Sequence, residues 1–207
     1  LHCPPTPVFS TDAVYDALDT LVEEGAIENY GVSVETVDEA LAAIARPGTA
    51  TVQIILNAFR LKPLDRVLPA AREAGVGIIA RVPLASGLLS GRYTTDTTFA
   101  ADDHRTYNRH GEAFDRGETF SGVDFEEGVA AAHEFAELVP EGVTPAQAAI
   151  AWIVAQDGVS TVIPGARSPE QARANAAAGD VRLPAGFDEA VRRIYDTHFR
   201  AAVHPRW

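Results

Sequence analysis

Apolar residues along this chain follow two spacings, one typical of short buried strands and one typical of amphipathic helices. Runs rich in Val, Ile and Thr predict strands at residues 27–32, 51–56, 76–82 and 159–163. Between these runs, apolar residues recur every three or four positions and predict helices at residues 12–24, between Ser33 and Pro47, and at 64–74, 125–138, 144–155, 169–178 and 187–199. Strands that alternate with helices indicate βαβ units and a parallel sheet, and therefore an α/β fold.

This alternation fits both a doubly wound sheet and a (β/α)8 barrel. A Gly/Ser-rich turn at residues 81–92 follows the third strand, and a Pro-Gly turn follows the fourth. Barrel enzymes often bind phosphate after their last two strands, which favours a (β/α)8 TIM barrel. A complete barrel takes about 250 residues and eight strands. We therefore expect residues 1–207 to form a single, incomplete barrel domain, from the end of strand 4 through strand 8 and the C-terminal helices, with strands 1–4 absent.

The turn after the fourth strand has the features of an anion site. The β-branched run 159–163 predicts a strand buried on both faces. The strand breaks at Pro164-Gly165, and Ser168 then stands as an N-cap with Pro169 at the first helical position. A helix N-terminus presents unpaired N–H groups, and Arg167 adds a positive charge suited to phosphate. An ordinary turn between a strand and a helix has the same pattern, so both interpretations stay open on this segment alone.

The net charge of the chain limits the kinds of partner that it can bind. The net charge is −12 and the isoelectric point is near 4.8. Such an acidic excess disfavours nucleic acid and anionic membranes as partners. Lys62 is the only lysine among 17 basic residues. Salt adaptation and a GC-biased genome both account for this composition.

Cysteine usage and hydropathy suggest a compartment. Cys3 is the single cysteine, which excludes an internal disulfide and favours a reducing, cytoplasmic location. The sequence has neither an apolar run of membrane-spanning length nor the pattern of a signal peptide. It begins at Leu1 and contains no methionine, so we expect a processed N-terminus or a piece of a longer protein.

The carboxyl ends of the predicted strands are where barrel enzymes place catalysis and binding. The residues at these ends are His2, Ser33, Gln53, Asn57, residues 81–87 and residues 165–168. Two neighbouring strand ends carry phosphate-type turns, and this pair suits a dinucleotide better than a monophosphate. Together the two turns are more specific than either alone.

Five short motifs in a fixed order carry a family resemblance. They are Leu1-His2-Cys3-Pro4-Pro5, Gly25 to Ser33, Val52-Gln53, Pro83 to Gly91, and Ile163-Pro164-Gly165 with Asn175. In this order and spacing they resemble the C-terminal two-thirds of an aldo-keto reductase. The resemblance implies NADP-dependent reduction of aldehyde or ketone carbonyls, with a small-molecule carbonyl substrate and with NAD as the alternative coenzyme.

The resemblance also implies roles for residues at the strand ends. His2 matches the histidine of the family's Asp-Tyr-Lys-His tetrad and would hydrogen-bond the substrate carbonyl. Ser33 and Gln53 match residues that hold the nicotinamide carboxamide, although Val34 stands where many members have Asn. Arg81 stands where many members stack an aromatic ring on the nicotinamide, and its guanidinium would either stack there or form a salt bridge.

The two turns hold the remaining coenzyme residues that the resemblance implies. Those expected over the pyrophosphate are Pro83, Leu84, Ser86 and Leu88. Those expected around the adenosine 2'-phosphate and adenine are Gly165, Ala166, Arg167, Ser168, Gln171 and Asn175. Many members have Lys where Gly165 stands and Arg where Gln171 stands, so a preference for NADP rests mainly on Arg167.

The tetrad's Asp, Tyr and Lys belong to strands that come before Leu1 in the family. Lys62 precedes Pro63 in a predicted loop and is a poor replacement for the missing lysine. We therefore expect the chain alone to be an inactive reductase. Two alternatives stay open, a nucleotide-binding regulatory or redox-sensing subunit of the same family and a phosphate-binding barrel isomerase or lyase.

A polar stretch at residues 94–122 is the longest predicted loop, and residues 99–114 form its central part. Its acidic and histidine residues, Asp102, Asp103, His104 and His110, match no recognised metal-ligand spacing. We therefore expect no metal site, and a solvated loop that shapes substrate access.

Overall fold

The computed structural model describes all of residues 1–207 and has a four-stranded parallel sheet at its centre. The strands are β1 (Tyr30–Ser33), β2 (Thr49–Ile55), β3 (Gly77–Arg81) and β4 (Val159–Val162). They lie side by side in chain order, and each pair of neighbours is parallel. The predicted α/β class, the four strands and their parallel pairing are confirmed.

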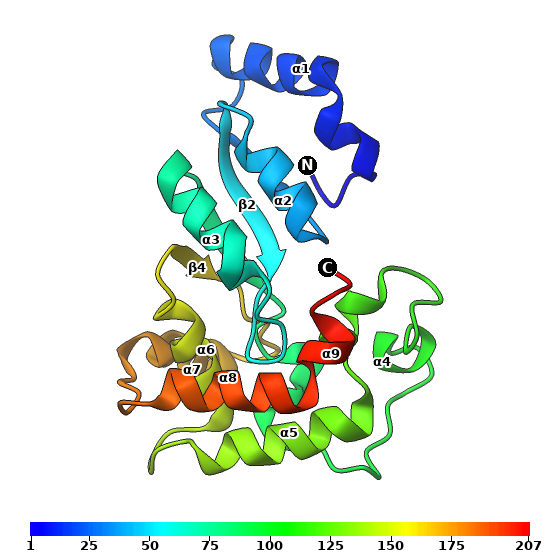
Figure 1. The fold of residues 1–207 in the computed structure, drawn as a ribbon, viewed down its shortest axis with the longest axis vertical. Helices are drawn as coiled ribbons and strands as arrows, with labels where there is room; N and C mark the ends of the chain where they lie inside the picture. The colour runs from blue at the N-terminus through cyan, green and yellow to red at the C-terminus, as the bar shows by residue number, and fades with distance from the viewer.

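Helices connect and cover the strands (Figure 1). They are α1 (Asp12–Glu23), α2 (Val37–Ile44), α3 (Pro63–Ala74), α4 (His104–Tyr107), α5 (Phe125–Glu137), α6 (Pro145–Val154), α7 (Pro169–Ala177), α8 (Phe187–His198) and α9 (Arg200–Val203). Short 3-10 helices add η1 (Thr6–Ser10), η2 (Ala85–Ser90), η3 (Arg116–Glu118), η4 (Phe120–Gly122) and η5 (Ala178–Asp180). Every predicted helix is present, and α4, η3 and η4 are additional elements inside the predicted polar loop.

Side-chain caps explain where several helices begin. Thr36 starts α2, because its hydroxyl accepts from Glu39 N while the Glu39 carboxylate accepts from Thr36 N. Thr144 and Gln147 form the same reciprocal pair at the start of α6. The Ser168 hydroxyl accepts from Gln171 N, so the predicted N-cap of α7 is confirmed.

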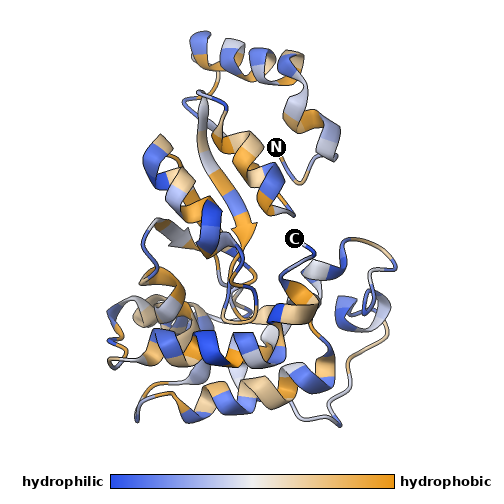
Figure 2. Cartoon of the chain, in the orientation of Figure 1, coloured by the Kyte–Doolittle hydropathy of each residue, from blue (hydrophilic) through white to orange (hydrophobic).

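The apolar core joins the sheet to the helices around it. One cluster of buried apolar residues includes Ile54 and Ile78 of the sheet and Phe135, Trp152 and Tyr195 of the helices. Each of these five side chains is at most 1% exposed. In Figure 2, β2 is apolar toward its carboxyl end, while α1 and α8 alternate polar and apolar positions. The helices thus turn an apolar face inward, as their spacing predicts. No helix combines the length and the apolar character that crossing a membrane would take.

Strand β4 differs from the prediction. Ser160 and Thr161 are exposed and Val159 and Val162 are only half-buried, so the expectation of a strand buried on both faces was wrong. The physical reason is that β4 pairs with β3 alone and forms an edge of the sheet. At the opposite edge, the backbone of Leu1 pairs with β1 through Leu1 N to Gly31 O at 2.7 Å and Ser33 N to Leu1 O at 2.9 Å.

Candidate functional site

His2, Ser33 and Gln53 come together at one side of the sheet. They line a cavity of about 380 Å³, together with residues of β1, β2 and β3. His2 is exposed and Gln53 is half-buried, and neither side chain forms a hydrogen bond inside the chain. Their polar groups are therefore available to a ligand in this cavity.

Ser33 is more constrained than its two neighbours in the cavity. It is 4% exposed, and its hydroxyl accepts from Cys3 N at 2.8 Å. The Cys3 thiol lies 3.3 Å from the same oxygen. The hydroxyl proton faces Leu1 O at 3.5 Å, a long contact that leaves this donor free for a better acceptor.

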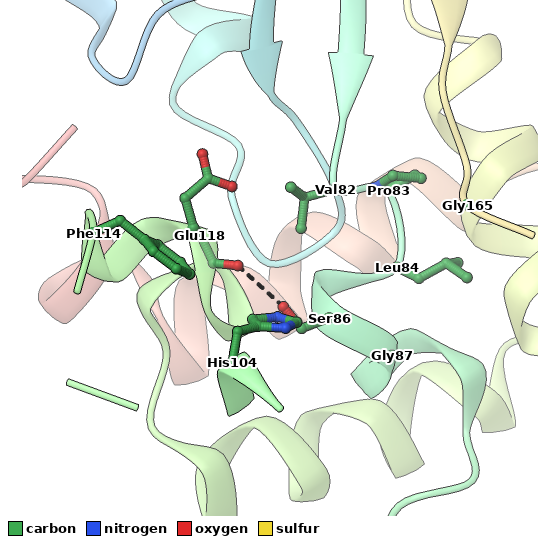
Figure 3. A pocket seen from close by; sticks show the side chains of 9 residues that line it. All are labelled: Val82, Pro83, Leu84, Ser86, Gly87, His104, Phe114, Glu118 and Gly165. Atoms are coloured by element: carbon green, nitrogen blue, oxygen red, sulfur yellow. Dashed lines mark hydrogen bonds between the residues drawn. The ribbon is translucent and has the colours of Figure 1, made fainter. Parts of the chain in front are cut away.

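The two predicted phosphate-type turns border a second cavity of about 360 Å³ (Figure 3). Its lining residues are Val82, Pro83, Leu84, Ser86 and Gly87 after β3, His104, Phe114 and Glu118 from the long loop, and Gly165 after β4. The adjacency that the sequence predicted for these turns is therefore present. Leu88 is fully buried in the core and supports the turn from beneath.

The turn after β3 has an unusual backbone. Val82, Ala85 and Ser86 have φ of 54°, 48° and 55°, in the left-handed region that L-residues rarely occupy. The Ser86 hydroxyl donates to Glu118 O at 3.2 Å and accepts from Phe120 N at 2.9 Å, and Figure 3 shows the first of these bonds. These bonds join the turn to the long loop and help to hold the strained conformation.

Asn57, which the sequence placed at a strand end without a specific role, positions this turn. It is fully buried, and its Nδ2 donates to Val82 O at 2.8 Å and to Ser121 Oγ at 2.7 Å. Its Oδ1 accepts from Phe59 N at 2.9 Å. The sequence signal was an amide side chain directly after the apolar residues 54–56. A polar side chain in such a buried position needs hydrogen-bond partners.

The turn after β4 is organised by its own residues. Arg167 N donates to Gln171 Oε1 at 2.6 Å, and Asn175 Nδ2 donates to Gly165 O at 3.1 Å. Gly165, Ala166, Arg167 and Gln171 are exposed, whereas Ser168 and Asn175 are half-buried. The Arg167 guanidinium has no ion-pair partner in the chain, so its charge is free for an anion beside the start of α7.

Arg81 forms a buried salt-bridge cluster. It is 7% exposed, and its Nη2 donates to Glu35 Oε1 at 3.0 Å and to Val34 O at 3.0 Å. Its Nη1 donates to the Glu118 carboxylate. Of the two interactions that the sequence left open for Arg81, the salt bridge is present in this structure. Stacking on a nicotinamide stays a prediction.

The surroundings of this cluster raise the pKa of Glu35 and of Cys3. Burial raises the pKa of Glu35 to about 7, an effect that Arg81 opposes and Glu118 reinforces. Burial also raises the pKa of the Cys3 thiol. Cys3, Glu35 and Glu118 offer metal-ligand atoms within 4.8 Å of one another. The Arg81 guanidinium supplies a positive charge among these groups.

Arginines of the long loop pack on aromatic rings. The sequence predicted a solvated loop and did not predict this packing. Arg105 pairs with Asp103 at 2.5 Å, and its guanidinium lies 4.3 Å from the centre of the Phe99 ring. The Arg109 guanidinium lies 5.1 Å from the Phe120 ring and 4.8 Å from that of Phe125. These cation–π contacts fix the loop that carries His104, Phe114 and Glu118 to the cavity.

Comparison with known proteins places this arrangement in a family. The family model described as Aldo/keto reductase family matches residues 1–196. Aldo-keto reductase str7 of Strobilurus tenacellus is 30% identical over 196 residues, which cover 92% of this chain and 54% of that protein. Aldo-keto reductase yakc of Schizosaccharomyces pombe, whose name specifies NADP(+), is 26% identical over 194 residues and is covered to 54%.

A solved structure agrees with these relatives. The glycerol dehydrogenase AKR11B4 from Gluconobacter oxydans aligns with a TM-score of 0.73 and 27% identity, over 95% of this chain and 57% of that chain. This chain thus spans about half the length of the curated relatives that it matches. The resemblance read from five short motifs is confirmed, and the chain belongs to the aldo-keto reductase family.

Proposed function

We propose that this chain is the coenzyme-binding part of an NADP-dependent aldo-keto reductase that reduces aldehyde or ketone carbonyls. In this proposal, residues 1–207 run from the end of strand 4 through strand 8 of a (β/α)8 barrel. Two observations support this placement. The chain covers 57% of a solved relative, and its sheet has an unpaired edge at β4. An open edge and a cavity against the sheet are what removal of the first strands from a closed barrel leaves.

The observation that carries the proposal is the shared cavity between the turns after β3 and β4. The first turn lines this cavity with Ser86 and the second lines it with Gly165. Arg167 lies outside the lining, two positions after Gly165, and its free charge stands exposed at the start of α7. A cleft between two such turns fits a diphosphate, because backbone N–H groups and a guanidinium both bind phosphate oxygens. Arg167 would hold the 2'-phosphate of NADP.

The cavity of about 380 Å³ that His2, Ser33 and Gln53 line would receive the nicotinamide end of the coenzyme. NADPH, when bound, supplies the hydride. Gln53, whose amide is unpaired, and Ser33, whose donor is weakly engaged, would hold the carboxamide. His2 would donate to the substrate carbonyl oxygen from the same cavity. Neither cavity contains a tyrosine with a neighbouring lysine. We therefore expect residues 1–207 alone to bind nucleotide without reducing carbonyls.

Arg167 provides the test of this function. In the protein that carries this chain, Arg167→Ala removes the one free cation beside the turn after β4. We expect NADPH affinity to fall about 10- to 100-fold, the range for loss of a charge-assisted hydrogen bond, while NADH affinity changes little. Titration of each coenzyme by fluorescence measures both values.

The matched control is Arg173→Ala. Arg173 is an exposed arginine of the same helix, α7, and it faces Glu170 at 3.8 Å. Arg173→Ala should change the affinities for NADPH and NADH by less than about twofold, as expected for a surface substitution. Equal losses of NADPH and NADH in Arg167→Ala would remove the 2'-phosphate role. Absence of nucleotide binding by the unsubstituted protein would refute the proposed function.

A further inference from the structure

The last residue of the chain is buried against the long loop. Trp207 is 7% exposed, and its Nε1 donates to Asp115 Oδ1 at 3.0 Å. The same oxygen accepts from Gly117 N at 2.7 Å. The indole therefore attaches to residues 115–122, which comprise η3 and η4 and are called here the 115–122 loop.

Glycines in this loop leave the space that the indole fills. A methyl group on Gly122 would overlap the Trp207 ring, and the three nearest atoms would all belong to that ring. A methyl group on Gly117 would overlap the Arg60 guanidinium and touch the same indole. The loop and the C-terminal tryptophan are thus complementary in shape as well as hydrogen-bonded.

The other side of the indole rests on Arg60, a buried arginine of the turn after β2. The Arg60 guanidinium lies 4.3 Å from the Trp207 ring centre and is 1% exposed. Its Nη2 donates to Glu35 O at 2.7 Å, directly after β1, and its backbone N donates to Asn57 O at 2.9 Å. Burial lowers the pKa of Arg60 to about 10, so it stays cationic at neutral pH and can bind the ring face.

The 115–122 loop carries two contacts of the candidate site. The Glu118 carboxylate pairs with Arg81, and Glu118 O accepts from Ser86 Oγ. Figure 3 shows this carbonyl directed at Ser86 while the carboxylate points away from it. Displacement of the loop would therefore remove one wall of the 360 Å³ cavity and release Ser86 and Arg81 together.

We propose that Trp207 is a positioning residue that holds the 115–122 loop closed over the cavity between the turns after β3 and β4. The indole joins the loop to Arg60, and through Arg60 to the ends of β1 and β2. Its loss opens the loop and, where nucleotide binds, accelerates nucleotide release. The second consequence rests on the proposed function, whereas loop closure does not.

Limited trypsin digestion tests loop closure without nucleotide. Arg116 lies inside the loop, and Arg105 and Arg109 precede it. Cleavage of a locally opened segment follows the population of the open form. In Trp207→Ala we expect cleavage at these sites to be at least about tenfold faster, or about 1.4 kcal/mol in opening free energy.

Two matched variants sharpen this comparison. Trp207→Phe keeps a ring over Arg60 but loses the bond to Asp115, and should show a smaller acceleration. Leu21→Ala removes an exposed apolar side chain on distant α1 and should leave cleavage unchanged. Unchanged cleavage in both Trp207 variants would overturn the inference.

Gly122→Ala supplies a test that does not require removing the tryptophan. In the Trp207 background the added methyl group should displace the indole and accelerate cleavage. In the Trp207→Ala background only the backbone cost of alanine at φ 78° remains, so the further effect should be smaller. Equal effects in both backgrounds would show that the glycine and the indole are not coupled, and would contradict the inference.

Nucleotide release gives the functional measurement. We expect NADPH to dissociate several-fold faster from Trp207→Ala than from the unsubstituted protein in a stopped-flow displacement experiment. An unchanged dissociation rate would overturn the coupling of the indole to the site. Failure of the unsubstituted protein to bind NADPH would instead remove the proposed function, and the trypsin comparison would decide loop closure.

Discussion

At the scale of single residues, backbone strain gathers around the two cavities. The non-glycine residues with positive φ are Cys3, Val82, Ala85, Ser86, Phe120 and Ser121. Cys3 lies beside the carboxyl end of β1, and the others lie directly after β3 or in the 115–122 loop. Such conformations cost about 1–3 kcal/mol each, and persist where surrounding contacts fix them. Here the contacts are those of Asn57 and Ser86, both of which join the turn after β3 to the 115–122 loop.

Glu35 leads to a prediction about pH at this scale. Its pKa rises from about 4.5 to about 7 on folding, so stability that is present below pH 4.5 is lost as the pH rises through about 7. Glu35→Gln cannot ionise and removes this loss, which amounts to about 3 kcal/mol at most. Urea unfolding measures the free energy of unfolding at pH 5 and at pH 8. Its decrease between these two pH values should be smaller in Glu35→Gln than in the unsubstituted protein.

The matched control for Glu35 is Glu23→Gln, which alters an exposed glutamate at the end of α1. It should keep the full decrease in unfolding free energy between the two pH values. An identical decrease in Glu35→Gln would show that Glu35 is ionised equally easily in the folded and unfolded protein.

The sequence could not decide the role of Arg81 because stacking and salt bridging use the same guanidinium. The partner Glu118 lies 37 positions later in the chain, in a segment predicted as irregular. Glu35 also lies beyond the predicted end of its strand. By contrast, Ser33 and Gln53 line one cavity, as expected for polar residues of neighbouring parallel strands, because they are register partners on β1 and β2. Their role toward a coenzyme stays a prediction.

At the scale of elements, His198 connects α8 to α5. Its Nδ1 lies 2.5 Å from Glu127 Oε1 and its Nε2 lies 3.0 Å from Glu134 Oε1. Burial alone would lower the pKa of His198, but the two carboxylates outweigh burial and raise it. The stability that this pair of contacts provides is complete below the ordinary histidine pKa and is lost as the pH rises through the raised value.

His198→Gln should therefore destabilise the protein at pH 6 and have a smaller effect at pH 9. Thermal unfolding at the two pH values measures the difference. His133→Gln is the matched control, because His133 is an exposed histidine of α5 without these contacts. If His198→Gln lost equal stability at pH 6 and pH 9, the charged imidazolium would not be what stabilises the contact between α5 and α8.

The helices were predictable because their signals are local. Thr36 with Glu39, Thr144 with Gln147, and Ser168 each form a cap within one turn of sequence. The burial of β4 was not predictable, because it depends on whether another strand lies beside it. The packing of the long loop was equally hidden, since Arg105 and Arg109 read as polar until aromatic rings come into contact with them.

At the scale of the whole molecule, a net charge of −12 is spread over 207 residues. Self-repulsion of this kind opposes a compact state and is screened by salt. Raising KCl from about 0.05 M to about 1 M, across which the screening length falls to about 3 Å, should raise the thermal unfolding midpoint.

Salt also separates the two explanations of the composition. A salt-adapted protein should unfold at low ionic strength, whereas a protein shaped by base composition should stay folded there. Sodium sulfate at matched ionic strength would reveal any contribution from apolar burial beyond screening. A midpoint that falls as KCl rises would contradict the repulsion argument.

The placement of Trp207 gives the protein an intrinsic optical probe. Indoles are present at two positions, and Trp152 is buried in α6 with its Nε1 bonded to Asp188, away from the long loop. The emission of Trp207 therefore reports on the cation beneath its ring and on solvent entering around it. Reduced nicotinamides absorb where tryptophan emits, so quenching by energy transfer would register a coenzyme without any attached dye.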